Sequence, residues 1–377
     1  MKNYLAAPTA ALFVLIIFQA ANAQQYIASN HAPIGVMGGH THQMGNHADQ
    51  MGDHAHQMGA HAHQTSEWMV SYRYMRMGME GNRVGTSGIS SDAIVTNIAN
   101  RFFEMPMQPP TLRVVPTSMT MGMHMLGVMY MPRDWLTLMV MGMHVTKKMD
   151  HVTYMGPTGT TPRGNFTTKS SSFGDSELTS LVRVFSKEAQ QFYFNLGFVL
   201  PTGSNLKTGT VLTPTGATPN LRLPYAMQNG GGTYNLKPGA TYIDTSGELY
   251  WGAQYLADIP LGKNTQSYSL GNAHMISAWL GYSPAPWVSG SLRLVGNTRA
   301  SIKGIDPDIV APVQTADPSN YGGEQLDFLL GINLIGQEGV LREHRLGFEL
   351  GLPLHQDLNG PQMARGWSLM IGWQKSL

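Results

Sequence analysis

A seven-residue repeat near the N-terminus holds the side chains best suited to metal chemistry. From residue 39 to residue 64 the chain reads GHTHQMGNHADQMGDHAHQMGAHAHQ. Imidazole is a ligand for Cu(II), Zn and Ni, and thioether sulfur is a ligand for Cu(I), so a segment with both can hold copper in either oxidation state. The predicted metal ligands are His40, His42, His47, His54, His56, His61, His63, Met44, Met51 and Met58.

The same repeat has a second interpretation, a low-complexity linker that grew by repeat slippage and binds nothing. Asp49 replaces the second histidine of its pair and weakens that copy as a chelator. Exposed neutral imidazoles bind the metal that is available, however, and this favours the first interpretation. No cofactor is assigned with certainty, and copper ions are the expected ligand. Metal ions and a periplasmic metal carrier are the expected partners.

Methionines at alternate positions form three further stripes, on residues 69–79, 119–131 and 139–143. Because side chains alternate between the two faces of a strand, each stripe occupies one face. In the first stripe the methionine face also holds Ser71 and Arg73, whereas Trp68 and Tyr72 lie opposite. We therefore expect the methionines to face the interior. The predicted transport path consists of Met75, Met77, Met119, Met121, Met123, Met125, Met139, Met141 and Met143.

The methionine stripes also have two interpretations. Aligned thioethers can bind a soft ion such as Cu(I) or Ag(I), and methionine is equally a flexible filler that packs a loop or the tail. Inward methionines place His124 and His144 on the lipid-facing side, where polar groups are costly. Charged side chains that share the inward face are expected to brace the barrel by ion pairs rather than line a conduction path. They are Arg73, Asp175, Glu177, Arg183, Arg293, Asp327, Arg345 and Glu349.

The sequence beyond residue 66 supplies the scaffold for these side chains, because it alternates apolar and polar residues. Phe192, Phe194 and Leu196 share one parity, for example, which is typical of a strand with one apolar face. Alternating segments of about ten residues are typical of outer-membrane barrels. The predicted fold is an all-β transmembrane antiparallel β-barrel of about 12 strands, near residues 67–79, 119–131, 135–147, 173–186, 191–201, 235–245, 248–260, 273–283, 287–300, 324–336, 344–355 and 365–377.

The connections between these segments predict the topology. Short turns alternate with long connections over residues 80–118, 148–172, 202–234, 261–272, 301–323 and 356–364. The last strand should then pair with the strand at 67–79, with both ends of the barrel on the periplasmic side. A soluble β-sandwich shows the same alternation and is the alternative fold.

The N-terminal 66 residues have a different character. Residues 1–23 combine Lys2, an apolar run and small residues at Ala21 and Ala23, which is typical of a secretory signal peptide. Residues 24–66 are rich in Gly, His and Gln, so we expect a disordered tail in the periplasm. The predicted domains are the signal peptide (1–23), the tail (24–66) and a barrel (67–377) in the cell outer membrane, whose lipids are a further partner.

Composition excludes several classes of function. Removal of Lys2 from the 24 basic residues leaves 23, which balance the 23 acidic ones, so the chain has no basic footprint for nucleic acid. Cysteine is absent, which excludes thiolate ligands and cysteine nucleophiles. No second apolar run reaches the length of about 18 residues that a helical membrane protein needs. No HExxH, phosphate loop or nucleophile elbow occurs, so we expect no enzyme.

Several segments resemble a family of proteobacterial outer-membrane proteins that are labelled as transporters and related to the meta-pathway phenol-degradation barrel family. They are HAPIGVMGGHTHQMG (31–45), SEWMVSYRYMRMGMEGNR (66–83), MTMGMHMLGVMYMPRDWLTLMVM (119–141), MDHVTYM (149–155), LPTGS (200–204) and RLPYAMQNGGGTYNL (222–236). The resemblance implies a barrel and transport, and it transfers no catalytic residue. This chain departs from the family pattern by expanding one His/Met block into four copies. The tail alone is similar in style to the Met/His-rich leaders of copper-resistance outer-membrane proteins.

The sequence thus predicts an outer-membrane channel or transport component for copper or another soft metal ion. The His/Met tail would collect metal at the periplasmic mouth, because tethered sites raise the local concentration. Two alternatives stay open at this point. One is a diffusion channel for small hydrophobic or aromatic compounds, and the other is a structural barrel with a metal-buffering tail.

Overall fold

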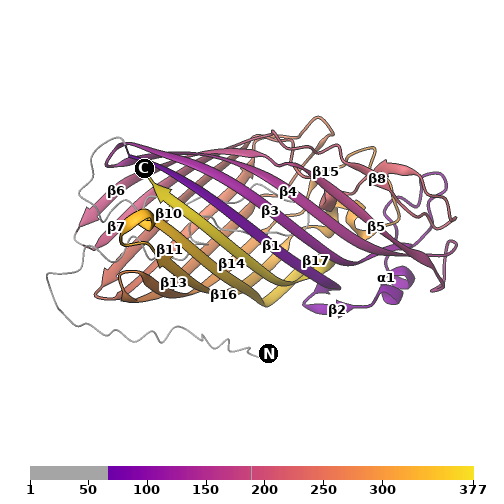
Figure 1. The fold of residues 1–377 in the computed structure, drawn as a ribbon. Helices are drawn as coiled ribbons and strands as arrows, with labels where there is room; N and C mark the ends of the chain where they lie inside the picture. Colours follow the sequence, from indigo (N-terminus) through magenta and orange to yellow (C-terminus); the bar gives the residue numbers. More distant parts are fainter. Residues whose placement is uncertain (1–66, 188) are drawn as a thin grey trace, which may run out of the picture.

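The computed structural model describes residues 67–187 and 189–377, which form a closed antiparallel β-barrel (Figure 1). The predicted signal peptide and tail, with the seven candidate histidines and Met44, Met51 and Met58, lie outside the described residues. No described helix is long and apolar enough to cross a membrane. The predicted fold class is confirmed for the barrel.

Eleven strand elements form the ring, and each pairs with its neighbours in antiparallel register. In order around the ring they are β1 (Glu67–Gly85), β3 (Val114–Arg133), β4 (Leu136–Tyr154), β6 (Ser176–Lys187), β7 (Gln190–Leu200), β10 (Asn235–Ser246), β11 (Leu249–Pro260), β13 (Ala273–Ala285), β14 (Val288–Arg299), β16 (Gly323–Ile335) and β17 (His344–Ser376).

The last element, β17, supplies two consecutive strands of the barrel. Its residues 345–358 pair with β16, and its residues 358–376 pair with β1. The chain reverses between these two arms at Gly360, whose φ of 77° is open to glycine without a steric penalty. A ring of purely antiparallel neighbours needs an even number of strands, so the two arms complete twelve. The prediction of a long connection over 356–364 is therefore wrong, because the strand pairing of both arms continues almost to the tight turn at Gly360.

Two hairpins extend farther than expected at the loop end. Residues 80–85, 114–118 and 148–154 belong to strands, and β5 (Pro162–Phe173) pairs with the upper part of β4. The apolar alternation stops before these segments, but their backbone groups still pair. The predicted strand 173–186 is interrupted at Gly174 and Asp175, where β5 ends and β6 begins. The expected loops 80–118 and 148–172 are correspondingly shorter.

The remaining elements lie in the long connections. A short helix, α1 (Ser91–Asn97), begins at Ser90, whose side chain accepts a hydrogen bond from the N–H of Ala93. The others are β2 (Ser87–Ile89), β8 (Thr208–Thr210), β9 (Asn220–Arg222), η2 (Tyr225–Met227), β12 (Tyr268–Ser269), β15 (Lys303–Gly304), η3 (Gln314–Ala316), η4 (Pro318–Asn320) and, in a turn at the opposite end, η5 (Gly339–Leu341).

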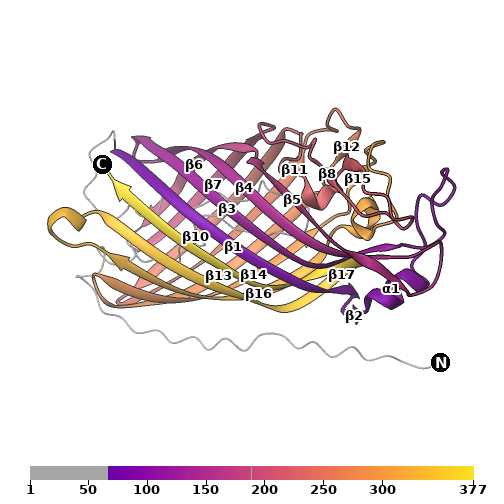
Figure 2. The ribbon, with the colours of Figure 1, turned by 45° about the vertical axis from the view of Figure 1, so that its right-hand side comes forward.

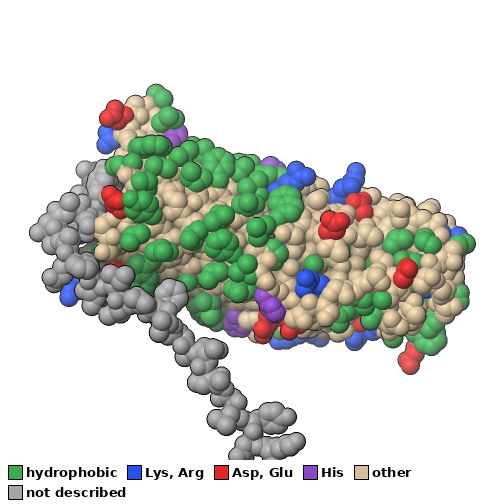
Figure 3. Space-filling view, turned by 90° about the horizontal axis from the view of Figure 1, so that it is seen from below, with side chains coloured by type: hydrophobic (Ala, Val, Ile, Leu, Met, Phe, Trp, Pro, Cys, Tyr) green, Lys and Arg blue, Asp and Glu red, His purple; other side chains and the backbone are tan. Residues whose placement is uncertain are grey.

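Short turns and long connections gather at opposite ends of the barrel, as expected (Figures 1 and 2). The C-terminus and the start of β1 lie at the short-turn end. Apolar side chains cover the outer surface of the half nearer the short turns, and charged side chains gather beyond them (Figure 3). Such an outward apolar band is the surface that a barrel presents to lipid.

Candidate functional site

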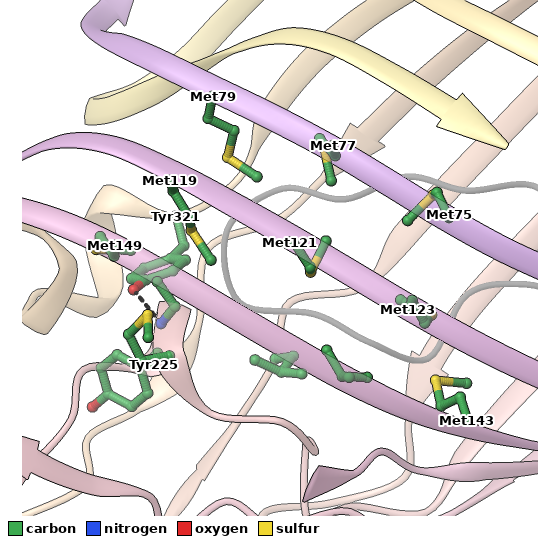
Figure 4. Close-up of a cluster of buried hydrophobic side chains, with 14 of the residues drawn as sticks. Met75, Met77, Met79, Met119, Met121, Met123, Met143, Met149, Tyr225 and Tyr321 are labelled. Atoms are coloured by element: carbon green, nitrogen blue, oxygen red, sulfur yellow. Dashed lines mark hydrogen bonds between the residues drawn. The ribbon is translucent and has the colours of Figure 1, made fainter. Parts of the chain in front are cut away.

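The methionine wall, formed by the inward methionines of β1, β3 and β4, confirms the predicted orientation of the stripes. Each of the nine methionines of the predicted path is 3% exposed or less, whereas Val140 of the alternate parity is 55% exposed. Methionine lies opposite methionine in the β1–β3 register, where Met75 pairs with Met123 and Met77 pairs with Met121. Their side chains point into a common interior (Figure 4).

The outward histidines that this orientation requires lie in an aromatic collar. His124 and His144 form one cross-strand row with Tyr74 and Phe173. The hydroxyl of Tyr72 lies 2.7 Å from Nδ1 of His124, and the rings of His144 and Phe173 meet edge-on at 5.7 Å. On these strands the collar marks the end of the apolar outer face. Amphipathic rings are favourable at a membrane interface, which removes the expected cost of burying these histidines in hydrocarbon.

Two long connections, residues 201–234 and 301–322, fold into the loop end of the barrel and form what we call the cap. Tyr225 and Tyr321 of the cap belong to the same apolar cluster as Met149 of the methionine wall (Figure 4). The Tyr321 hydroxyl accepts a hydrogen bond from the N–H of Ala226 at 3.0 Å and donates one to the carbonyl of Thr315 at 2.6 Å. The first bond joins the two connections, and the second fixes the Tyr321 hydroxyl within its own connection.

Polar side chains inside the barrel bind the cap through hydrogen bonds to its backbone. Lys147 of β4 is buried and donates hydrogen bonds to the carbonyls of Ala226 and Gln228, both at 2.6 Å. Asp175 accepts hydrogen bonds from the backbone N–H groups of Gly203 and Gly231, both at 2.8 Å. A buried charge is costly unless it is hydrogen-bonded, so these groups stabilise the inward position of the connections.

Next to the methionine wall lies an ion-pair wall on β14, β16 and β17, which adjoins it because β17 pairs with β1. The guanidinium of Arg293 donates two hydrogen bonds to the carboxylate of Glu349, at 2.8 and 2.6 Å. Arg345 donates one to Asn333 at 2.7 Å. These pairs agree with the expectation that mixed inward charges brace the barrel. Two further buried ion pairs are Arg365–Asp327, in the same wall, and Lys237–Glu177 between β10 and β6.

The two walls meet around a small cavity of about 20 Å³. Met75 and Met77 line it on one side, and Arg293, Asp327 and Arg365 line it on the other. This volume suffices for about one water molecule. A solute that passes at this level must displace side chains, and the methionines are the ones that can move between rotamers without losing an ion pair.

A much larger pocket of about 540 Å³ lies at the loop end, between the β4–β5 hairpin and the cap. Its lining is mainly apolar, with Val114, Phe166, Leu212 and Val310 among the residues that contribute. The hairpin and the cap are joined beside it by a hydrogen bond from the Thr153 hydroxyl to the carbonyl of Leu212, at 2.8 Å. Its size and apolar lining match those of pockets that bind small organic molecules.

Two buried polar atoms in the pocket lack a hydrogen-bond partner among the described residues. They are Nδ1 of His151 and the hydroxyl oxygen of Thr168, on neighbouring strands β4 and β5. His151 lies opposite Phe166 in the β4–β5 register, and their rings stack at 4.6 Å. Leaving a buried polar group unpaired is costly. Both atoms have almost no exposed surface, so a solute in the pocket would reach either one only after its side chain moves.

The sequence interpretation missed this pocket because it treated the long connections only as links between strands and predicted no structure within them. The available signal was the apolar content of residues 211–214 (VLTP) and 309–313 (IVAPV), which is unusual for segments that face only solvent. The described residues contain no group of three His, Asp or Glu side chains placed to hold a metal ion. The predicted metal ligands of the tail lie outside the described residues, so that part of the prediction stays untested.

Comparisons with known proteins identify the fold. No protein-family model and no curated protein matches the chain, so the resemblance to the phenol-degradation barrel family stays a prediction. The COG4313 outer membrane channel from Pseudomonas putida F1 matches with a TM-score of 0.52 and 12% identity, over 84% of this chain and 97% of that one. This similarity shows a shared barrel fold.

Two more distant structures also match in outline. A Pseudomonas aeruginosa FadL homologue has a TM-score of 0.37 and 10% identity, over 82% of this chain and 89% of that one. The P. putida toluene transporter TodX has a TM-score of 0.37 and 9% identity, over 84% of this chain and 91% of that one. Both are too different in shape to support an argument about function.

Proposed function

We propose that this barrel is an outer-membrane channel for small hydrophobic or aromatic compounds, which enter through the apolar pocket at the loop end. The pocket of about 540 Å³ is the observation that carries the proposal. Met107 on its lining is fully exposed, while Val114 is buried, so the pocket reaches from the surface toward the interior. The description of the COG4313 protein as an outer membrane channel supports transport.

The pocket is continuous with the methionine wall. Phe166, Val211, Val310 and Ala311 line the pocket and also pack against the apolar cluster that contains the methionines. A solute that leaves the pocket toward this cluster meets mainly apolar side chains, the thioethers among them. Methionine has several accessible rotamers and repacks easily, so this wall can yield to an apolar solute of variable shape.

A substitution that fills the pocket with a large side chain tests whether solutes enter there. Ala311→Trp should block most barrel-dependent uptake of toluene by cells that lack other hydrocarbon channels, because the indole would occupy the pocket. Val340→Trp is the matched control, since Val340 is 91% exposed in the turn at the opposite end. Heat-modifiable gel migration would show that both variants fold. Normal toluene uptake by folded Ala311→Trp would refute entry through this pocket.

We propose further that the solute has an apolar body and one hydrogen-bonding group, which the Thr168 hydroxyl on the pocket lining meets after its side chain rotates. Benzyl alcohol and toluene differ mainly by such a group, so the alcohol should compete better for the pocket. Thr168→Val keeps the shape and removes the hydroxyl, and it should lower the preference for benzyl alcohol by about tenfold or less, since one neutral hydrogen bond contributes about 1 kcal/mol. Competition for barrel-dependent uptake of labelled toluene measures that preference.

A second candidate, a path for soft metal ions, is favoured by the methionine wall itself, since nine inward sulfurs are potential Cu(I) ligands. Replacement of Met121, Met123, Met139 and Met141 by Leu conserves volume and removes only the sulfur ligands. A fall in silver or copper flux with normal toluene uptake would support metal transport. Unchanged metal flux would leave these methionines with packing and solute passage alone.

We further propose that the long-loop end faces the cell exterior, which places the N-terminal tail in the periplasm as a metal collector. Single cysteines provide the test, because the natural chain has none. A membrane-impermeant thiol reagent should label Thr215→Cys in intact cells and should not label Ser246→Cys, which ends β10 next to a short turn. The reverse pattern would overturn the orientation.

A further inference from the structure

The outer surface of β1, β3, β4 and β5 carries a basic groove directly above the aromatic collar. Beyond the collar row, the next residues of the outward parity form a row that contains Arg76 and Thr146, and the row after it contains Thr120, Lys148 and Lys169. Arg76, Lys148 and Lys169 are exposed. The outer faces of β1 and β4 therefore pass from apolar to aromatic to basic toward the loop end.

Small residues of β3 create the hollow between these cations. A pocket of about 440 Å³ is lined by Tyr74, Arg76, Thr120, Gly122 and Lys169, together with neighbouring polar residues of β4 and β5. A Cβ at Gly122 would lie 2.9 Å from the Thr146 hydroxyl and 3.5 Å from that of Tyr74. Glycine at this position thus keeps the floor of the groove open between two hydroxyl groups.

The protein balances only one of the three positive charges in the groove by an ion pair among the described residues. Lys148 and Lys169 lie directly opposite each other across β4 and β5, an arrangement that destabilises a sheet unless an anion compensates it. Lys148 contacts Asp150 at 3.2 Å, whereas Arg76 and Lys169 form no salt bridge among the described residues. Asp150 and Glu80 lie in the next row toward the loops.

We infer that this groove binds the phosphate groups of a glycolipid of the outer leaflet, with its acyl chains on the apolar band below the collar. The proposal rests on the long-loop end facing outward, and it is independent of the transported solute. Three cations and the groove hydroxyls supply charge-assisted hydrogen bonds for phosphate. Exposed Leu126 and Val140 on the same strands supply the surface for acyl chains, which distinguishes a lipid from a free anion.

The test measures which lipids stay bound to the barrel. Wild-type protein in phosphatidylcholine nanodiscs containing bisphosphorylated lipid A should retain lipid A in native mass spectrometry. The combined variant Arg76→Gln, Lys148→Gln and Lys169→Gln should retain at least about tenfold less, since each cation near a membrane surface contributes about 1 kcal/mol. The matched control changes three exposed cations of the short-turn end to Gln, namely Arg133, Lys187 and Arg342, and it should retain lipid A like the wild type.

Two further arms identify the source of the phosphate. Dephosphorylated lipid A with the same acyl chains should be lost from the wild type, and excess inorganic phosphate should not displace bisphosphorylated lipid A. Equal retention of the dephosphorylated lipid would mean that the acyl chains alone hold the lipid, and it would overturn the proposal. Displacement by inorganic phosphate would make it a free-anion site and overturn the lipid assignment. Equal retention by the triple variant would also contradict it.

Discussion

The interior of this barrel has a methionine wall on β1, β3 and β4, and an ion-pair wall on β14, β16 and β17. Both are buried, but they differ in how much each side chain depends on its neighbours. The paired guanidinium and carboxylate of Arg293 and Glu349 need fixed distances, whereas a thioether packs well in several rotamers. The cap joins the methionine wall's apolar cluster. One side of the interior is thus fixed by paired charges, and the other side is packed by side chains that can change rotamer.

The largest loss in the free energy of unfolding should come from removing one partner of a buried ion pair. Arg293→Met leaves Glu349 buried and unpaired, which should lower the free energy of unfolding by about 3–5 kcal/mol. Urea unfolding in lipid vesicles, followed by gel mobility, measures it. Arg342→Met is the control, because its pair with Glu343 is exposed and should contribute about 1 kcal/mol or less.

The double variant Arg293→Met with Glu349→Leu sharpens this test. Removal of both charges should restore most of the lost stability, since a buried pair replaced by apolar residues is often neutral. A cost for Arg293→Met no greater than that for Arg342→Met would mean that the ion-pair wall does not brace the barrel.

A smaller effect is expected on the methionine wall. Met123→Ala removes a buried side chain and should cost about 2 kcal/mol, at the low end for such changes, because the neighbouring methionines can collapse into the space. Met123→Leu conserves volume and should cost less than about 1.5 kcal/mol. The same urea titration compares them. A cost for Met123→Ala near the value for Arg293→Met would show that the methionine wall is as rigid as the other.

The smallest effect concerns the cap at high pH. Burial raises the pKa of Tyr225 to about 12, above the value of about 10 expected for an unfolded chain. The cap is thus stabilised by the neutral phenol below about pH 10, and this contribution is lost as the pH rises toward the folded pKa. Phenolate absorbance of the wild type minus that of Tyr225→Phe should show one group titrating near pH 12. A difference titration near pH 10 would mean that Tyr225 is accessible to water.

Much of the fold follows from the sequence because a barrel strand carries its own signal. The alternation at Phe192, Phe194 and Leu196 indicates that one face of the strand contacts lipid, and this pattern can be recognised without any distant residue. The polar extensions of β1, β3, β4 and β5 lie above the lipid-facing zone, so they lack that signal. The turn at Gly360 was similarly obscured, because the polar residues around it are typical of a longer loop.

The same reasoning predicts only one part of the candidate site, the inward methionines, and does not predict the pocket. The inward parity of Met75 and Met77 follows from their position beside Ser71 and Arg73 on one strand. The pocket depends on side chains from a hairpin and two connections, which alternation does not bring together. Lys147 shows the difficulty, since its burial is compensated by carbonyls of Ala226 and Gln228 in the cap.

The bridge between Val114 and Val313 has a consequence for biogenesis. These two residues pair beside the pocket, although one lies on the second strand of the ring and the other lies just before β16. Contacts between such distant parts of the chain form late, because the intervening loop must first be closed. The complete lining of the pocket therefore forms only after the segment around Val313 has closed onto the second strand of the ring.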